Sequence, residues 1–192
     1  MQELLTERLL LRQWQECDVE PLIRMNQDSQ VTEFMHGPLT RQESEKRAAT
    51  YKNHIETHGW GRWAVSIPNQ ADFIGWIGLC PIIYALPFLS PSLIEVGWRL
   101  LPEFWGNGYA TEGAKAALKY GFEILKKNEI VSLTIAANIR SQRVLEKLGM
   151  HHAPQDTFDH PKVEKGSPLK QQLLYRITKK QWEEITFHNG SL

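Results

Sequence analysis

The chain alternates short apolar runs with polar segments, and this alternation predicts a mixture of strands and helices. Runs rich in β-branched and aromatic residues predict strands at residues 9–14, 62–67, 72–84, 94–101, 131–136 and 173–177. Polar or amphipathic stretches predict helices at residues 18–28, 40–57, 111–122, 141–148 and 179–187, and the polar residues 154–168 predict a long loop. This order of elements favours a mixed α/β sheet over a helical bundle.

Local signals mark where several helices begin. Thr40 with Glu43, and Thr178 with Gln181, have the spacing of a capping box, in which two side chains satisfy N–H groups at the start of a helix. Asp18 is a further candidate cap, because its carboxylate could accept from the first turn of the helix at residues 18–28.

The most informative segment is the turn at residues 105–110, which reads WGNGYA. It follows the predicted strand 94–101 and precedes the predicted helix 111–122, so two glycines stand where a helix N-terminus offers unpaired N–H groups. Residues without bulk let an anion approach that backbone closely. The turn therefore predicts a phosphate cradle.

Two common nucleotide templates fail at this turn. A dinucleotide fingerprint needs a third glycine where Thr111 stands, and a P-loop needs a lysine one residue before Lys115. These failures favour a diphosphate that is held by backbone amides without a metal ion. The alternative is a glycine-rich turn with a structural role alone.

Composition limits the class of protein. The chain has 192 residues and a formal net charge of zero, which suits one domain and gives no indication of a nucleic-acid or membrane partner. Its two cysteines, Cys17 and Cys80, have no metal-binding spacing and are expected to be reduced thiols, with Cys80 buried in a strand. We expect a soluble, cytoplasmic protein.

The motifs together resemble those of the GNAT acetyltransferases, and within them the RimJ/RimL branch. The family's acyl-CoA motif, Q/R-x-x-G-x-G/A, corresponds to Trp105, Gly108 and Ala110, with tryptophan at the Gln/Arg position as is typical of that branch. Further segments match in the right order at residues 6–14, 73–79, 94–98 and 138–150. The resemblance covers residues 6–178 of a single domain that spans 1–192.

The resemblance implies a mostly antiparallel central sheet, flanked by helices and splayed between the fourth and fifth predicted strands. It also implies acetyl-CoA as co-substrate, no metal, and an oxyanion that is met by a backbone N–H near Trp98. The residues that it implies for the cofactor are Trp98, Leu100, Trp105, Gly106, Asn107, Gly108, Tyr109, Ala110, Thr111, Asn138 and Ser141.

Acetyl transfer to an amine needs a base for the amine and an acid for the leaving thiolate. Glu95 is the candidate base, because strand alternation places it on one face with Gly97 and Arg99; an ion pair with Arg99 is the alternative. Ser141 is the candidate acid, since Leu145 stands where many family members have a tyrosine. The alternative is that Ser141 caps the helix that follows, and the two roles can coexist.

The acceptor amine is less well defined by the sequence. In the resembling branch the acceptor site corresponds to Phe34, Met35, His36 and Trp76, although aromatic residues in strands are more often core. We expect an acetyl-CoA-dependent N-acetyltransferase, monomeric or homodimeric, that transfers acetyl directly to a small-molecule amine or a protein N-terminus. The alternative is a non-catalytic acyl-CoA-binding or sensing domain.

Overall fold

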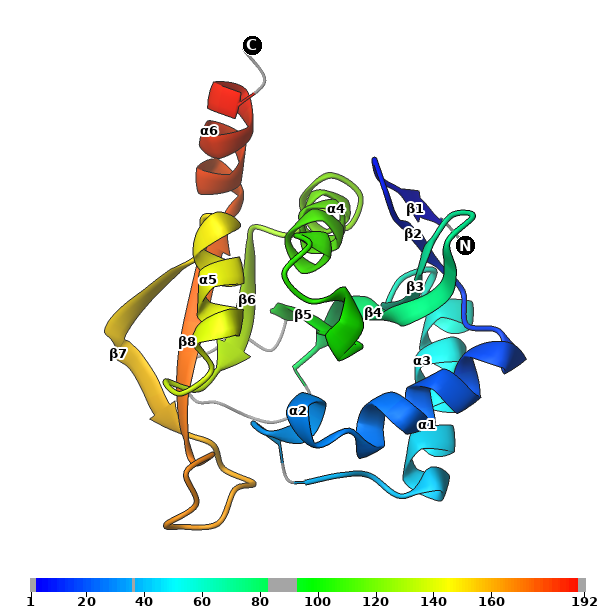
Figure 1. The fold of residues 1–192 in the computed structure, drawn as a ribbon. Coiled ribbons are helices and arrows are strands. Elements are labelled where there is room, and N and C mark those ends of the chain that lie inside the picture. The colour runs from blue at the N-terminus through cyan, green and yellow to red at the C-terminus, as the bar shows by residue number, and fades with distance from the viewer. Residues whose placement is uncertain (1–2, 36, 83–92, 190–192) are drawn as a thin grey trace. The chain divides into compact units, whose positions relative to one another are not determined.

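The computed structural model describes residues 3–35, 37–82 and 93–189 (Figure 1). Its strands are β1 Leu4–Leu5, β2 Leu10–Arg12, β3 Arg62–Ile67, β4 Ala71–Pro81, β5 Ile94–Leu100, β6 Glu129–Thr134, β7 His151–Asp159 and β8 Gln171–Thr178. Its α-helices are α1 Val19–Gln27, α2 Ser29–Thr32, α3 Arg41–His58, α4 Tyr109–Glu123, α5 Ile139–Lys147 and α6 Lys179–Asn189. Short 3-10 helices lie at Glu16–Asp18 and Pro102–Phe104.

The strands form a mixed sheet in the order β1-β2-β3-β4-β5-β6-β8-β7. Among the described pairings, only that of β5 with β6 is parallel, and the others are antiparallel. The predicted mixed α/β class is therefore confirmed. The residues group into two compact units, one of residues 1–80 and 97–117 and the other of residues 81–96 and 118–192, which we describe in turn.

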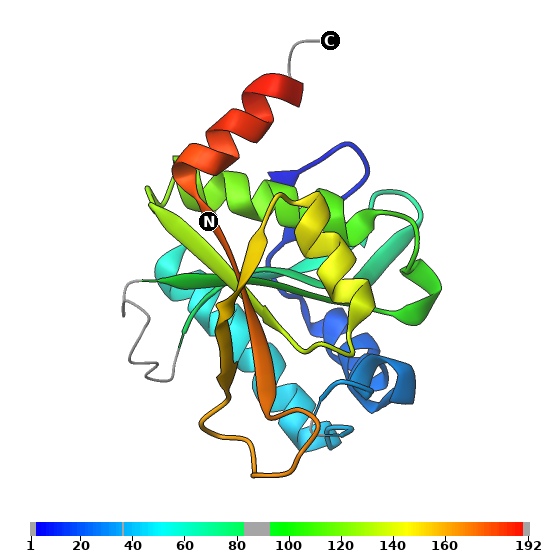
Figure 2. The same ribbon diagram turned by 90° about the vertical axis from the view of Figure 1, so that its left-hand side faces the viewer.

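The first unit is built on the antiparallel strands β1 to β4. Helices α1 and α3 pack on each other within it and lie side by side in both views (Figures 1 and 2). Consecutive residues are buried in β3, from Trp63 to Ile67, and in β4, from Phe73 to Leu79, so both faces of these two strands are covered. Fully buried side chains of this unit include those of Leu9, Leu11, Met25, Ile55, Trp63, Ile74, Ile77 and Leu79.

Two glycines let β4 approach its neighbours more closely than any side chain would allow. A Cβ atom at Gly75 would lie 2.1 Å from the carbonyl oxygen of Arg99, and one at Gly78 would lie 2.0 Å from that of Gly61. Gly75 also has a φ of +138°, which side-chain-bearing residues rarely adopt. Both glycines are therefore required by backbone packing within the sheet.

Asp18 is the N-cap residue of α1, as predicted, but its carboxylate does not accept a hydrogen bond from that helix. Its carboxylate instead forms a bidentate ion pair with Arg12, with Nη–Oδ distances of 2.7 and 2.8 Å, and both residues are buried. An ion pair stabilises a buried carboxylate more than a hydrogen bond to a helix terminus would, because an unpaired buried charge is costly. Asp18 precedes α1 without a side-chain hydrogen bond to that helix.

Both predicted capping boxes are confirmed. The Thr40 hydroxyl accepts from the N–H of Glu43, whose carboxylate accepts from the N–H of Thr40 at 2.8 Å. In the same way, the Thr178 hydroxyl accepts from the N–H of Gln181, and the Gln181 side chain accepts from the N–H of Thr178 at 2.9 Å. These boxes start α3 and α6.

The second unit contains β6, β8 and β7, with α5 and α6. Figure 2 shows α6 running directly on from the end of β8. Its core is apolar and includes Phe122, Ile130, Val131, Leu145, Leu174, Ile177 and Trp182. The start of β5 joins this unit by parallel pairing, through Ile94 with Ile130 and Glu95 with Val131.

β7 lies where the sequence predicts a loop, so that prediction was wrong over residues 154–159. The strand carries no buried residue, and its register against β8 shifts between His152 and Thr157, so it lacks the apolar alternation that marks a strand. Backbone pairing with β8 forms the strand, and ion pairs add to it: Arg176 of β8 pairs with Asp156 of β7 at 3.0 Å and with Glu129 of β6 at 3.2 Å.

Candidate functional site

The turn between β5 and α4 has a backbone conformation that glycine adopts readily and other residues do not. Gly106 and Gly108 have φ values of +79° and +82°. A Cβ atom at Gly106 would meet nothing within 4 Å, and one at Gly108 would come 3.4 Å from Nη2 of Arg8. The two glycines are thus required by conformation, and the surface above Gly106 is open.

Helix α4 begins two residues before the predicted start at Thr111. The carbonyl of Gly108 already accepts the N–H of Glu112 at 3.0 Å, so helical hydrogen bonding starts at the turn itself. The N–H groups of residues 109–111 therefore belong to the first helical turn, which has no internal acceptors for them and carries the positive end of the helix dipole. Such a terminus can bind a phosphate group.

Side chains of the turn hold its shape. The indole N–H of Trp105 donates to the carbonyl of Leu100 at 2.8 Å and so ties the turn to the end of β5. The side-chain amide of Asn107 donates to the carbonyl of Trp105 at 3.1 Å. The side chains of Trp105 and Asn107 therefore stabilise the conformation of the turn through these hydrogen bonds.

An arginine from the β1–β2 connection anchors the turn. Arg8 donates to the carbonyl of Asn107 at 3.0 Å, pairs with the Glu112 carboxylate at 2.7 Å, and lies 4.7 Å from the ring centroid of Tyr109. Thr6 donates to the same carboxylate at 2.6 Å. Burial raises the pKa of the Glu112 carboxyl, but the hydrogen bonds from Thr6 and Arg8 outweigh it and leave that pKa below its usual value.

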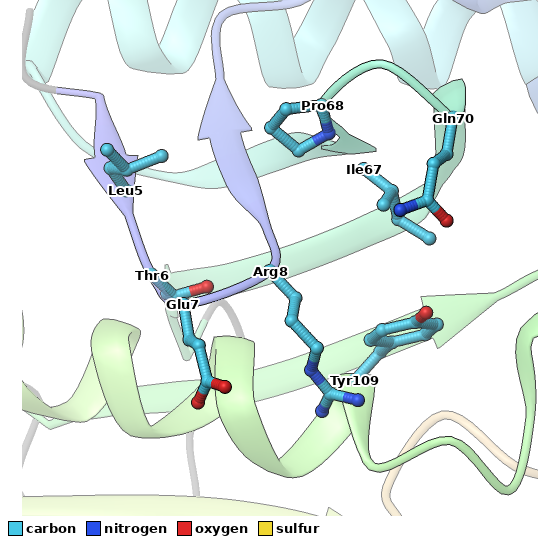
Figure 3. Close-up of a pocket in the computed structure, with 8 residues that line it drawn as sticks. All are labelled: Leu5, Thr6, Glu7, Arg8, Ile67, Pro68, Gln70 and Tyr109. Atoms are coloured by element: carbon cyan, nitrogen blue, oxygen red, sulfur yellow. The ribbon is translucent and has the colours of Figure 1, made fainter.

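A surface pocket adjoins this anchor (Figure 3). Its volume is about 190 Å³, and its lining residues are Leu5, Thr6, Glu7, Arg8, Ile67, Pro68, Gln70 and Tyr109. Figure 3 shows the Arg8 side chain reaching from the β1–β2 connection toward Tyr109. The pocket is smaller than the range of roughly 300–1,000 Å³ that ligand sites occupy, so it gives no support for a cofactor site of its own.

β5 carries several predicted site residues in the first unit. Trp98 is half-buried, and the carbonyl of Leu100 is engaged by Trp105. A Cβ atom at Gly97 would lie 3.6 Å from the Trp76 ring, an ordinary contact, so this glycine leaves space beside the tryptophan. Trp76 itself is only 6% exposed, which favours a core position for most of its ring.

The second unit holds Glu95, Asn138 and Ser141. Glu95 is half-buried and pairs in register with Val131. The predicted alternative in which Ser141 caps α5 was wrong, because the cap is Asn138, whose side-chain oxygen accepts from the N–H of Ser141 at 3.1 Å. Within the described residues the Ser141 hydroxyl has no hydrogen-bond partner.

The position that resembles the family's tyrosine is part of the core here. Leu145 is fully buried on α5. A different tyrosine lies near the same helix: Tyr175 of β8 donates to the side chain of Gln142 at 3.4 Å, and burial raises the pKa of its hydroxyl. Sequence reasoning missed this hydroxyl, and its position on a strand distant in sequence gave no local signal.

Phe34 and Met35 lie in the turn after α2 and are half-buried. His36, the third residue expected at the acceptor, lies outside the described residues. The assignment of these residues to the acceptor stays a prediction.

Cys80 is not the fully buried thiol that the sequence predicted. It is half-buried, and Arg62 donates to its sulfur at 3.0 Å. In the described part of the chain, no three His, Cys, Asp or Glu side chains group closely enough to hold a metal ion. No described helix is long and apolar enough to cross a membrane.

Comparison with known proteins agrees with this geometry. A family model described as an acetyltransferase (GNAT) domain matches residues 8–151. The FsC-acetyl coenzyme A-N(2)-transacetylase of Aspergillus fumigatus is 31% identical over 153 residues, which cover 71% of this chain and 62% of that protein. The uncharacterized N-acetyltransferase YnaD of Bacillus subtilis is 27% identical over 178 residues, 92% of this chain and 97% of the relative.

Solved structures share the fold. A GNAT-family acetyltransferase from Bacillus anthracis superposes with a TM-score of 0.75 at 25% identity, covering 93% of this chain and 99% of that one. A spermidine N-acetyltransferase from Vibrio cholerae, solved with CoA and spermine, superposes with a TM-score of 0.70 at 21% identity, covering 92% and 98%. With the family model matched over most of its length, this chain belongs to the GNAT family of acetyltransferases.

Proposed function

We propose that this protein is an acetyl-CoA-dependent N-acetyltransferase of the RimJ/RimL-like branch. It would transfer acetyl directly, in a ternary complex, to a primary amine of a small molecule or a protein N-terminus. The observation that carries the proposal is the turn at residues 105–108, whose glycine conformations open the first turn of α4 to an anion. Membership of the GNAT family, whose enzymes use acetyl-CoA, supports the same ligand.

The residues of this turn suit the diphosphate of acetyl-CoA. Backbone N–H groups at Gly106, Asn107, Gly108, Tyr109, Ala110 and Thr111 would serve as its donors. On β5, backbone groups of Trp98 and Leu100 would pair with the pantetheine arm, although the Leu100 carbonyl already accepts from Trp105. Trp98 is therefore the stronger candidate of the two, and its N–H is also the candidate donor to the oxyanion.

Two side chains of the second unit suit the pantetheine and the thiol. Capping of α5 uses the amide oxygen of Asn138 and leaves its NH₂ group able to donate to a pantetheine carbonyl. The Ser141 hydroxyl could donate a hydrogen bond to the sulfur of the leaving thiolate, and this weak donor suffices because a thiol has a pKa of about 8.5, so its thiolate is a weak base and leaves readily. Glu95 would accept the proton of the amine, which is mostly protonated at neutral pH.

A thiol-release assay with acetyl-CoA and a panel of amines tests the proposal. We expect Glu95→Gln to lower kcat by about 100-fold or more, the usual range for loss of a general base, and Ser141→Ala to lower it less. Glu129→Gln is the matched control, because Glu129 is also a strand carboxylate but pairs with Arg176 at the sheet surface. Melting curves of each variant with CoA separate loss of chemistry from loss of binding.

The rival function predicts a different pattern. A non-catalytic acyl-CoA-binding domain would be stabilised by CoA and would release no thiol with any amine. The buried Leu145 in place of a tyrosine is the observation that favours this rival. Thiol release that is unchanged in both Glu95→Gln and Ser141→Ala would refute their assigned roles.

A further inference from the structure

A cluster of cationic and aromatic side chains lies in the first unit, apart from the turn. We call it the Arg99 cluster, and its members are Asn26 of α1, Tyr51 of α3, Arg62 of β3, Trp76 of β4 and Arg99 of β5. The two guanidinium carbons lie 5.0 and 5.6 Å from the centroid of the Trp76 ring. Two positive charges therefore share one aromatic surface.

The side chain that accepts a hydrogen bond from Arg99 is neutral, so it does not compensate the positive charge. Nη1 of Arg99 donates to the side-chain oxygen of Asn26 at 2.8 Å, and Asn26 is itself buried and donates to Ser44 at 3.1 Å. Within the described part of the first unit, no carboxylate pairs with Arg99. A guanidinium offers five donors in a planar fork, so this single bond leaves most of them for another acceptor.

The surroundings of Arg99 disfavour its charge. The pKa of Arg99 is lowered to about 10, mainly by burial and to a smaller extent by nearby Arg47 and Arg62, while Tyr51 raises it. The group is still charged at neutral pH. A positive charge that is partly buried, surrounded by other cations and unpaired with a carboxylate is stabilised by any anion that binds to it.

The cluster also has the means to admit a ligand. Arg99 is half-buried and is therefore partly exposed to solvent. Gly97, which lies on β5 with Arg99, has no side chain to cover the Trp76 ring of β4. The indole nitrogen of Trp76 is buried without a hydrogen-bond partner among the described residues. An arginine with a purely structural role in such a place would be expected to have a carboxylate partner.

We propose that the Arg99 cluster binds an anionic oxygen group, a carboxylate or a phosphate, carried by the amine that this enzyme acetylates. This inference rests on the proposed function and narrows its acceptor. The bidentate geometry of arginine suits both groups. A polyamine is disfavoured, because its second ammonium group would meet the charges of Arg62 and Arg99.

Matched acceptors provide the test. 5-Aminopentanoate and 1,5-diaminopentane have the same chain length and differ in one end group, and an aminoalkyl phosphate separates phosphate from carboxylate. We expect kcat/KM for an anionic amine to exceed that for the diamine by about tenfold or more, as one charge-assisted pair allows. A preference for the diamine would overturn the proposal.

Two variants test the role of the Arg99 charge, one by deleting it and the other by neutralising it. Arg99→Gln deletes it, and Asn26→Asp places a carboxylate against it while Arg99 stays in position. We expect both to raise KM for the anionic amine about tenfold or more and to leave KM for the diamine equal or lower. Arg24→Gln, which deletes an exposed arginine of α1 outside the cluster, is the matched control.

Failure of the proposed function is distinguishable from failure of this inference. If no amine supports thiol release, melting of the CoA-bound protein with 5-aminopentanoate still reports on the cluster. A rise in melting temperature that Arg99→Gln abolishes and Arg24→Gln retains would uphold anion binding. Equal behaviour of the wild type and both cluster variants, with unchanged melting temperatures in the absence of ligand, would refute it.

Discussion

Two features of the first unit suit anions, and they do so with different kinds of charge. The turn at residues 105–108 offers backbone N–H groups, and the cation beside it, Arg8, is already paired with Glu112. The Arg99 cluster offers guanidinium groups, and its central arginine is paired with the neutral Asn26. The turn therefore offers an anion partial charges, whereas the cluster offers the whole charge of Arg99.

The two features also differ in how strongly they depend on the identity of the residues that form them. A backbone cradle serves any ligand with a diphosphate, because every residue carries an N–H group. A cluster of side chains from α1, α3, β3, β4 and β5 depends on the particular residues at each position. Cofactor binding is thus expected to tolerate changes in surface charge, and acceptor choice is not.

Replacement of a turn glycine gives the largest expected effect. Gly108→Val places a β-branched residue at a φ of +82° and 3.4 Å from Nη2 of Arg8, so it should strain the backbone by about 1–3 kcal/mol and obstruct the approach of a phosphate. We expect the Kd for CoA, measured by calorimetry, to rise about tenfold or more.

Gly166→Val is the matched control for backbone strain. Gly166 has a φ of +91°, and a Cβ atom there would meet nothing within 4 Å. We expect it to lower stability and leave CoA binding unchanged. Equal CoA binding by Gly108→Val and the wild type would remove the turn from the cofactor site.

Loss of the pairing of Arg8 and Thr6 with Glu112 is expected to give the next largest effect, a decrease in stability. Glu112→Gln removes the charge that accepts from Thr6 and Arg8, and we expect it to lower the free energy of unfolding by about 2 kcal/mol. Denaturant unfolding measures this loss. Glu20→Gln is the control, because its pair with Arg41 is exposed and should contribute little.

The same carboxylate predicts a pH dependence of stability. The pKa of Glu112 is lower in the folded than in the unfolded chain, so its contribution is present above the unfolded value of about 4.3 and is lost as pH falls through the folded value. Unfolding measured between pH 7 and pH 3 should show this loss in the wild type. A parallel profile in Glu112→Gln would contradict the assignment.

Ionic strength gives the smallest effect and sharpens the comparison. Salt screens the attraction of an anionic amine for the Arg99 cluster, although partly buried charges are screened less than exposed ones. We therefore expect KM for the anionic amine to rise only about two- to threefold between low and high salt. The KM for 1,5-diaminopentane should fall or stay constant over the same range. The same trend for both amines would indicate that the cluster does not contact the acceptor.

Features that depend on neighbouring residues could be predicted from the sequence. The turn and the capping boxes at Thr40 and Thr178 follow from side chains that are close along the chain. The strand β3 was predicted with its observed bounds, because its mostly apolar run ends at the turn that begins with Pro68. The order of motifs then gave the family.

Features that depend on distant partners could not be predicted. Arg176 of β8 pairs with Asp156 of β7, a residue of another strand 20 positions away. The pairing of Arg8 with Glu112 joins residues more than a hundred positions apart. In each case the two charged residues come together only in the folded chain, and the sequence around either residue does not indicate its partner.

The glycines of β4 make the chain informative under random mutagenesis. At Gly75 and Gly78 any side chain would collide with a neighbouring backbone oxygen, so tolerance there reports on whether the protein folds. At Gly106 a side chain would meet open space, so a substitution that lowers activity beyond its cost in stability reports on ligand binding. A library of glycine variants, sorted by expression and by acetyl transfer, would therefore separate selection for the fold from selection for the cofactor.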